Sequence, residues 1–138
     1  MISGHATFSG TLRAAERHPA IAFNDLGSTG LRISPAGFGC YRVSSGVSAH
    51  RDAMVQALTN GINLIDTSAN YADGGSEQLV GEVLADLIGT QRVTREAVVV
   101  VSKGGYLQGQ NYRLSQERKQ AGNPFADLVE YADGLEHC

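Results

Sequence analysis

Four consecutive valines, Val98 to Val101, constrain the fold of this chain more than any other part of its sequence. Together with Ala97 they form a continuous run that is rich in β-branched side chains. Such a run is typical of a strand that is buried on both faces of a parallel sheet. Two further apolar segments, at 36–43 and 62–65, have the length of neighbouring strands. The sequence therefore predicts a small parallel sheet of three strands.

Helices are predicted between these strands. Ser48 is a candidate N-cap for the first helix, which ends before Gly61. Ser76 is a candidate N-cap for the second helix, which carries a wide apolar face and ends at Gly89. Strands that alternate with helices of this length are typical of βαβ units. A β-hairpin is predicted over 21–34, before the first strand of the sheet.

The composition argues against two classes of protein. The chain has 138 residues, which is enough for one globular domain and too few for two. Its formal net charge is −3 and its arginines are scattered, which argues against a nucleic-acid-binding surface. No stretch approaches the length of about 18 apolar residues that a membrane-spanning helix needs. The sequence therefore predicts neither nucleic acid nor membrane as a partner.

The cysteines indicate the compartment. Cys40 and Cys138 lie far apart, and neither has a second ligand at metal-binding spacing. Two free thiols, no disulfide and no metal site are therefore predicted. The N-terminal residues also lack the continuous apolar segment of a secretory signal. We therefore expect a cytoplasmic protein.

The two end segments fit the alternating pattern less well. Residues 1–20 are predicted to form an extension with a short helix at 12–18. Residues 106–138 are polar and rich in glycine, so a long polar loop is predicted there, with one helical turn at 128–132 as its only regular structure. Three parallel strands do not close into a barrel, and they leave an exposed sheet edge. The sequence therefore predicts either a small, open sheet or a piece of something longer, truncated before the rest of a barrel. The exposed edges also predict that the chain associates with itself.

Asp66, Tyr71 and Lys103 form the strongest candidate site. Asp66 follows one predicted strand and Lys103 follows the valine run, so both lie at the carboxyl edge of the sheet, where parallel folds hold their sites. Tyr71 lies on the loop after Asp66 and could reach the same pocket. A cation beside a phenol stabilises its phenolate form, which makes it a proton donor near neutral pH. The alternative is a structural ion pair that ties two strands, with Tyr71 at its rim.

Small residues also follow the first predicted strand. Gly37 and Gly39 let the backbone approach a ligand there. The third glycine of the dinucleotide-binding fingerprint is missing, so a simple glycine bend is the alternative interpretation. His137 follows no apolar strand and is predicted to be solvated or to start a helix.

Several of these motifs occur together, and in the same order, in one family. The sequence resembles the aldo-keto reductases over about residues 21–105. The matching segments are 26–34, which resembles their N-terminal hairpin, 37–39, which resembles their first barrel strand, 61–71 with 74–77, which resemble their signature, and 95–103, which resembles their third strand.

This resemblance implies an α/β fold, namely an incomplete (β/α)8 TIM barrel with an N-terminal β-hairpin and only the first three parallel strands and two helices. It implies that Tyr71 donates a proton to a carbonyl oxygen, that Lys103 stabilises the resulting phenolate and that Asp66 holds Lys103. The residues that it implies beside an NADP or NAD cofactor are Gly39, Cys40, Tyr41 and Asp66.

The implied function is that of an NAD(P)-dependent oxidoreductase acting on a small carbonyl or alcohol substrate. The family's fourth catalytic residue is a histidine after a fourth apolar strand, and His137 does not match that context. A full barrel needs about 250 residues. The complete protein is therefore expected to be active and the 138-residue chain alone inactive. The alternative is a non-catalytic interaction module or a decayed, truncated reductase.

Overall fold

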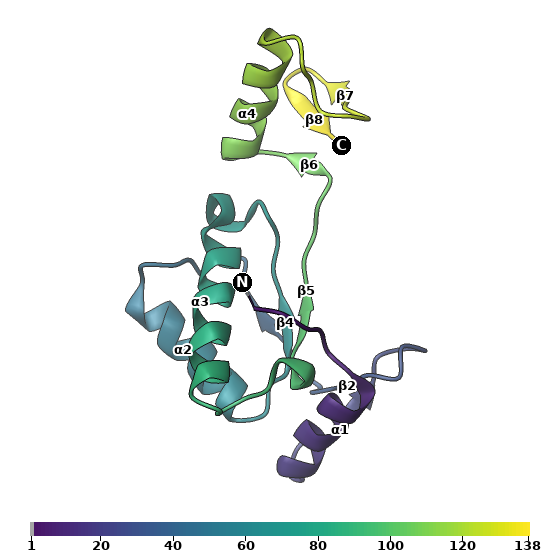
Figure 1. Ribbon diagram of the computed structural model, residues 1–138, viewed down its shortest axis with the longest axis vertical. Helices are drawn as coiled ribbons and strands as arrows, with labels where there is room; N and C mark the ends of the chain where they lie inside the picture. Colours follow the sequence, from purple (N-terminus) through teal and green to yellow (C-terminus); the bar gives the residue numbers. More distant parts are fainter. Residues whose placement is uncertain (1) are drawn as a thin grey trace.

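The computed structural model describes residues 2–138. It contains a parallel sheet of three strands, and helices connect these strands along the chain (Figure 1). The strands, in their order across the sheet, are β3 (Phe38–Gly39), β4 (Leu64–Asp66) and β5 (Val99–Val101). The connecting helices are α2 (Ser48–Thr59) and α3 (Gly75–Gly89). Both strand pairs are parallel, which confirms the predicted alternation of strands and helices.

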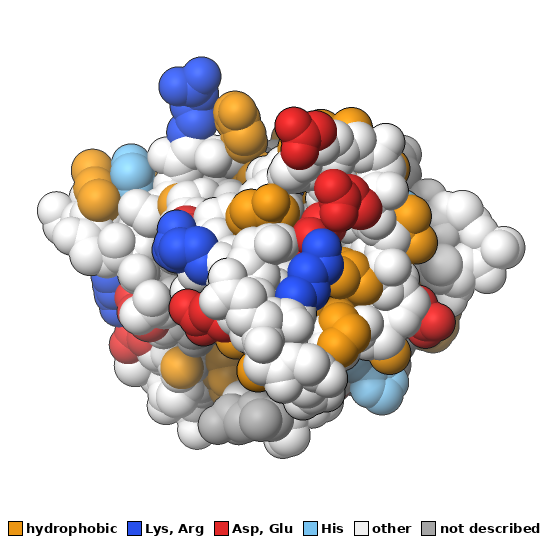
Figure 2. Space-filling model, turned by 90° about the horizontal axis from the view of Figure 1, so that it is seen from above, with side chains coloured by type: hydrophobic (Ala, Val, Ile, Leu, Met, Phe, Trp, Pro, Cys, Tyr) orange, Lys and Arg blue, Asp and Glu red, His pale blue; other side chains and the backbone are white. Residues whose placement is uncertain are grey.

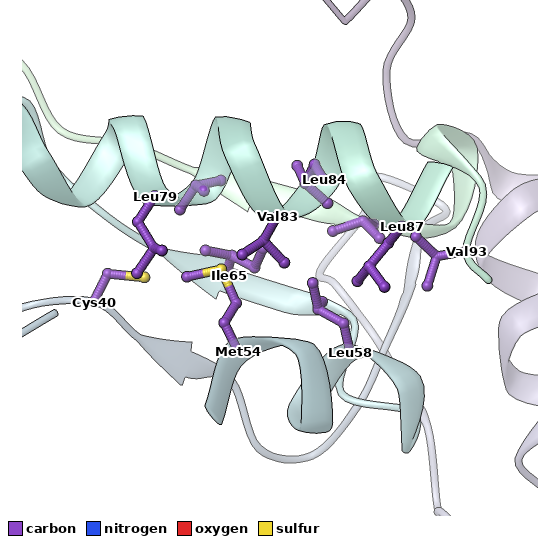
Figure 3. Packing of buried hydrophobic residues seen from close by; sticks show 11 residues of the cluster. Cys40, Met54, Leu58, Ile65, Leu79, Val83, Leu84, Leu87 and Val93 are labelled. Atoms are coloured by element: carbon purple, nitrogen blue, oxygen red, sulfur yellow. The ribbon is translucent and has the colours of Figure 1, made fainter. Parts of the chain in front are cut away.

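The hydrophobic core lies where α2, α3 and β4 meet, and Figure 3 shows their side chains pointing toward one another. Ile65 is fully buried at the centre of β4, and Leu64 and Asp66 on either side of it are half-buried. Side chains alternate between the two faces of a strand, so the helices cover one face of β4 and leave the other more open. The core side chains that Figure 3 labels are Cys40, Met54, Leu58, Ile65, Leu79, Val83, Leu84, Leu87 and Val93.

The valine run is covered less completely than its sequence predicts. Val98 and Val99 are buried, but Val101 is 41% exposed. β5 is an edge strand of the described sheet and pairs only with β4. Part of the hydrophobic surface of the valine run is therefore left exposed by residues 2–138.

The predicted N-caps were wrong in detail. The cap positions are Val47 for α2 and Gly74 for α3, and neither side chain makes a capping hydrogen bond. Ser76 lies instead in the first turn of α3 and is fully buried. Its hydroxyl lies 2.8 Å from the Thr67 hydroxyl and donates to the Cys40 carbonyl oxygen at 3.2 Å. Ser76 therefore joins α3 to the ends of the strands. Its hydroxyl bonds these residues instead of capping the helix.

The N-terminal segment is docked on the body of the fold. Helix α1 (Phe8–Arg17) begins four residues before the predicted start, because the Thr7 side chain accepts a hydrogen bond from the Gly10 amide. The predicted hairpin consists of β1 (Asn24–Asp25) and β2 (Arg32–Ile33). The buried Thr11 hydroxyl accepts a hydrogen bond from the Arg32 amide at 3.1 Å. Helix α1, which lies in the segment predicted as an extension, therefore packs against the hairpin.

Asn63 joins three parts of the fold through hydrogen bonds. Its side-chain oxygen accepts from the Ser34 amide at 2.8 Å, and its side-chain nitrogen donates to the carbonyl oxygens of Arg32 and Ala97. Asn63 is only 4% exposed. Each of these buried polar groups would be costly without a partner, so this single amide fixes the hairpin against the strand ends.

The largest departure from the sequence-based prediction is at residues 106–138. They form a small unit beyond the carboxyl ends of β4 and β5 rather than a long polar loop (Figure 1). The elements are β6 (Tyr106–Leu107), α4 (Gly109–Gln120), β7 (Val129–Ala132) and β8 (Leu135–His137), and the strands form an antiparallel sheet of order β6–β8–β7. The helical turn predicted at 128–132 is therefore mainly strand β7, and His137 lies in strand β8.

A buried carboxylate holds this C-terminal unit together. Glu136 on β8 is 2% exposed and accepts hydrogen bonds from Ser115 at 2.6 Å and from Gln116 at 2.8 Å. Lys119 forms an ion pair with it. The Lys119 ammonium, and then the Ser115 hydroxyl, lower the pKa of Glu136 to about 2. The interior of the unit is therefore polar, which explains why no apolar period marks helix α4.

Figure 2 looks onto the end of the molecule that carries this unit, where acidic, basic and hydrophobic side chains are intermixed. Within residues 2–138, no helix has the length and apolar character required to cross a membrane.

Candidate active site

The carboxyl ends of β4 and β5 bring Asp66 and Lys103 together, as their places in the sequence predict. Asp66 pairs with Gly39 on one side and with Val101 on the other, and Lys103 follows two residues after Val101. The Lys103 ammonium forms an ion pair with the Asp66 carboxylate and donates to the Thr67 carbonyl oxygen at 3.0 Å. Sequence reasoning did not identify Thr67 as a partner of Lys103. Its position directly after Asp66 could have indicated that its backbone lies at the same edge of the sheet.

The Lys103 ammonium is held in its charged form. The Asp66 carboxylate, and after it the Tyr71 hydroxyl, raise the pKa of Lys103 above its usual value. A lysine is already protonated in the neutral range, and the raised pKa extends that charged form to higher pH. A fixed positive charge therefore stands at this edge of the sheet.

Tyr71 lies beside that charge. It is the first residue of the short 3-10 helix η1 (Tyr71–Gly74), and the Lys103 ammonium lies 4.8 Å from the centre of its ring. The Tyr41 ring packs edge-on against Tyr71 with 5.2 Å between ring centres. The structure thus brings Asp66, Tyr71 and Lys103 into one cluster, as the site prediction requires.

The four residues that the resemblance implies beside a cofactor fall into two groups. Gly39 and Tyr41 are exposed, Asp66 is half-buried, and an added Cβ at Gly39 would meet no atom within 4 Å. The backbone at Gly39 is therefore open on this side. Cys40 is fully buried in the core and contributes nothing to that open side. Burial also raises the pKa of the Cys40 thiol above its usual value.

Aromatic side chains from the C-terminal unit form a separate cluster, which includes Tyr106, three residues after Lys103. Tyr106 packs edge-on against Tyr131, with 5.6 Å between ring centres, and the His137 ring lies 5.6 Å from that of Tyr131. Tyr106 and His137 line a shallow hollow together with Gly104 and Gly105. Three residues of chain span about 11 Å at most, so this hollow adjoins Lys103. Sequence reasoning missed the cluster because its members lie on separate strands that it did not predict.

The arrangement of Asp66, Tyr71 and Lys103 can move a proton. A tyrosine hydroxyl beside a fixed ammonium can donate a proton to an oxygen that gains negative charge, because the cation stabilises the phenolate left behind. Asp66 keeps the ammonium in place through the ion pair. His137 takes no part in the cluster of Asp66, Tyr71 and Lys103, since its ring packs against Tyr106 and Tyr131.

Comparison with known proteins identifies the family. The model of the Aldo/keto reductase family matches residues 37–122, which is more than half of the chain. The chain belongs to this family, as its sequence motifs predict. The match includes Asp66, Tyr71 and Lys103.

The curated relatives are larger proteins. The chain is 34% identical to the L-galactose dehydrogenase of Arabidopsis thaliana over 86% of its own length and 38% of that protein. It is also 34% identical to the 6-dehydroglucose reductase of Novosphingobium aromaticivorans, over 78% of its own length and 38% of that protein. The NADH-specific methylglyoxal reductase of Escherichia coli is 34% identical over 58% of this chain and 25% of that protein. The chain thus spans less than two fifths of the length of these relatives.

Solved structures of the family have a similar fold. An aldo-keto reductase from Bacillus halodurans, in its holo form, matches with a TM-score of 0.56 and 30% identity, over 65% of this chain and 28% of that one. A thermostable aldo-keto reductase matches with a TM-score of 0.52 over 78% of this chain and 41% of that one. The second is 24% identical and shows likeness of fold alone.

Proposed function

We propose that the complete protein containing this chain is an NAD(P)-dependent oxidoreductase that reduces a small carbonyl compound or oxidises the matching alcohol. The observation that carries the proposal is the cluster of Asp66, Tyr71 and Lys103 at the carboxyl edge of the sheet. The sheet and its helices are proposed to be the first part of a (β/α)8 barrel. A cytoplasmic location fits the free thiols of Cys40 and Cys138, which a reducing compartment keeps unpaired.

The exposure of the ion pair favours this function over a purely structural tie. The side chains of Lys103 and Asp66 are 47% and 49% exposed. Ion pairs that water reaches this freely contribute little to stability. Two strands that needed a tie would gain little from this one, whereas a proton-donating tyrosine gains a fixed positive charge.

In the proposed mechanism, Tyr71 donates its hydroxyl proton to the substrate oxygen during reduction. Lys103 stabilises the phenolate, and Asp66 with the Thr67 carbonyl oxygen fixes the Lys103 ammonium. Gly39 and Tyr41 would lie beside the nicotinamide cofactor, and the buried Cys40 would not touch it. The cofactor supplies the hydride. The other strands of the barrel would complete the cofactor site, so residues 1–138 alone are proposed to be inactive.

The relatives suggest which substrates to test. Their names point to hydroxylated sugars and to methylglyoxal, a small carbonyl compound. We propose a substrate of this hydroxylated or α-oxidised carbonyl class, and either NADH or NADPH as the reductant.

The test is turnover of methylglyoxal and of L-galactose by the complete protein with each cofactor. Tyr71→Phe should lower kcat by about 10²-fold or more while cofactor binding is kept, because general-acid catalysis contributes roughly that much. Tyr112→Phe is the matched control, since it removes a hydroxyl from helix α4 and should leave kcat unchanged. Unchanged turnover in Tyr71→Phe would contradict the role of Tyr71. A complete protein that binds neither cofactor would favour the alternative of a non-catalytic interaction module.

A further inference from the structure

The loop that carries Tyr71 is bonded to the C-terminal unit on both sides of that residue. Before Tyr71, the Asn70 side-chain nitrogen donates to the Tyr106 carbonyl oxygen at 3.0 Å. After it, the Asp73 carboxylate accepts from the Gln110 amide at 2.8 Å. The Gln110 side chain also donates to the Asp73 carbonyl oxygen at 2.7 Å. Residues that lie 36 and 37 positions apart in the chain are thus joined around the proposed proton donor.

The backbone after Tyr71 adopts a conformation that it would not favour alone. Ala72 has φ 50° and ψ 36°, and Asp73 has φ 52° and ψ 43°. Both lie in the left-handed region, which is disfavoured for residues with a Cβ, and they do so in succession. Such a conformation persists where the surroundings hold it in place. The bonds from Gln110 reach the second of these two residues directly.

Helix α4 depends on the same contact. Its N-cap residue, Gln108, makes no side-chain capping bond, and its first turn contains no acidic residue. The first amides of a helix need acceptors and favour a negative charge near them. Asp73 supplies both from outside the helix. The tie therefore serves both partners, since it caps α4 and holds the Tyr71 loop.

Gly109 makes the approach possible. A Cβ at Gly109 would lie 2.2 Å from the nearer Asp73 carboxylate oxygen, which is closer than real contacts allow. Gly109 also has φ +53°. Any side chain there would push Asp73 away from α4. The neighbouring ion pair of Arg113 with Asp73, at 3.4 Å between well-exposed side chains, adds little to the contact.

We propose that the C-terminal unit, residues 106–138, is a clamp that holds the Tyr71 loop in its productive position, with Asp73, Gln110 and Gly109 as positioning residues. In this role the unit acts on catalysis through Tyr71 and does not itself touch the reacting atoms. The inference rests on the proposed function for its catalytic consequence, but the clamp itself can be observed without any turnover.

The first experiment compares Gly109→Ala with Gly122→Ala in the complete protein. Gly122 follows the other end of α4, has φ +70° and has no atom within 4 Å of an added Cβ, so its substitution brings the same backbone strain without the collision. Hydrogen exchange is measured at the Tyr71 and Asp73 amides, which bond to the Ser68 and Asn70 carbonyl oxygens. Exchange there should rise on the order of tenfold in Gly109→Ala and stay unchanged in Gly122→Ala.

The kinetic constants kcat and KM, measured with methylglyoxal, test the effect of the clamp on catalysis. Gly109→Ala should lower kcat by as much as about 10²-fold, the cost of a small misplacement of a catalytic group, with little change in KM. Gly122→Ala should keep both constants. Equal losses in the two variants, or unchanged exchange in Gly109→Ala, would overturn the clamp.

Substitutions of Asp73 separate the clamp from backbone strain. Asp73→Asn keeps a side-chain oxygen for the Gln110 amide and a residue that tolerates the left-handed region, so exchange and kcat should remain near the wild type. Asp73→Gly relieves the strain but removes the acceptor, and it should loosen the loop. A tighter loop in Asp73→Gly would overturn the proposal. If the wild type showed no turnover while Gly109→Ala still released the loop, the proposed function would fail and the clamp would stand.

Discussion

At the residue scale, the clearest sequence signals are charged side chains that follow apolar strands. Asp66 and Lys103 meet because parallel strands end at the same edge, a property of the fold that sequence order already contains. The environment of Cys40 was not predictable in the same way. A residue just past a strand can face either side, and only the packing of α3 shows that Cys40 faces the core.

Glu136 provides a prediction about pH. Its pKa is lowered from 4.5 to about 2 by Lys119 and its hydrogen-bond donors, so its contribution to stability is complete above pH 4.5. That contribution should be lost as the pH falls from 4.5 through about 2. Two measurements over this pH range should show the loss in the wild type. One is thermal unfolding of the complete protein, and the other is hydrogen exchange at the β8 amides. Glu136→Gln should remove the pH dependence, whereas Glu117→Gln, at an exposed position of helix α4, should keep it. Parallel pH profiles for wild type and Glu136→Gln would contradict this assignment.

At the element scale, prediction succeeded where burial is apolar. The valine run predicts β5 because it is a continuous, β-branched run. The apolar face of α3 predicts that helix because its buried side chains repeat with the helical period. Helix α4 buries only Ser115, and its unit is organised around Glu136. A polar interior has no hydrophobic period, so neither α4 nor its sheet could be found from the pattern. The clamp was missed for the same reason.

Asn63 allows a prediction about how elements are held together. Asn63→Ala leaves the buried Ser34 amide and Ala97 carbonyl oxygen, and the part-buried Arg32 carbonyl oxygen, without this partner. We therefore expect a loss of about 2 kcal/mol or more in the free energy of unfolding, at about 1–3 kcal/mol for each buried unmatched group. Asn60→Ala is the control, because Asn60 bonds only at the exposed end of α2. Denaturant unfolding of the two variants measures the difference. Equal, small losses would show that the hairpin is held by other contacts.

At the scale of the whole molecule, the described residues leave one face and both edges of the parallel sheet, β3 and β5, short of partners. β5 pairs only with β4, and Val101 at its end is 41% exposed. Edges of this kind template pairing with other chains unless they are covered. In the proposed complete barrel the following strand covers this edge. The family of the chain could be predicted from its sequence, whereas its association depends on whether the edge of β5 is covered.

The isolated 138-residue chain should therefore associate with itself through β5, and a pair of charged variants tests this. Val101→Lys places an ammonium on the open edge and should shift the chain toward the monomer, because a charge on an edge strand opposes pairing. Val129→Lys is the matched control, since Val129 is 46% exposed on β7, an edge strand of the C-terminal sheet. Light scattering over a range of concentrations measures the masses. A wild-type chain that stays monomeric with a sharp unfolding transition would contradict association, and a response to Val129→Lys alone would assign it to the C-terminal sheet. In the complete protein neither substitution should matter for association, because the barrel would then supply the partner that β5 lacks.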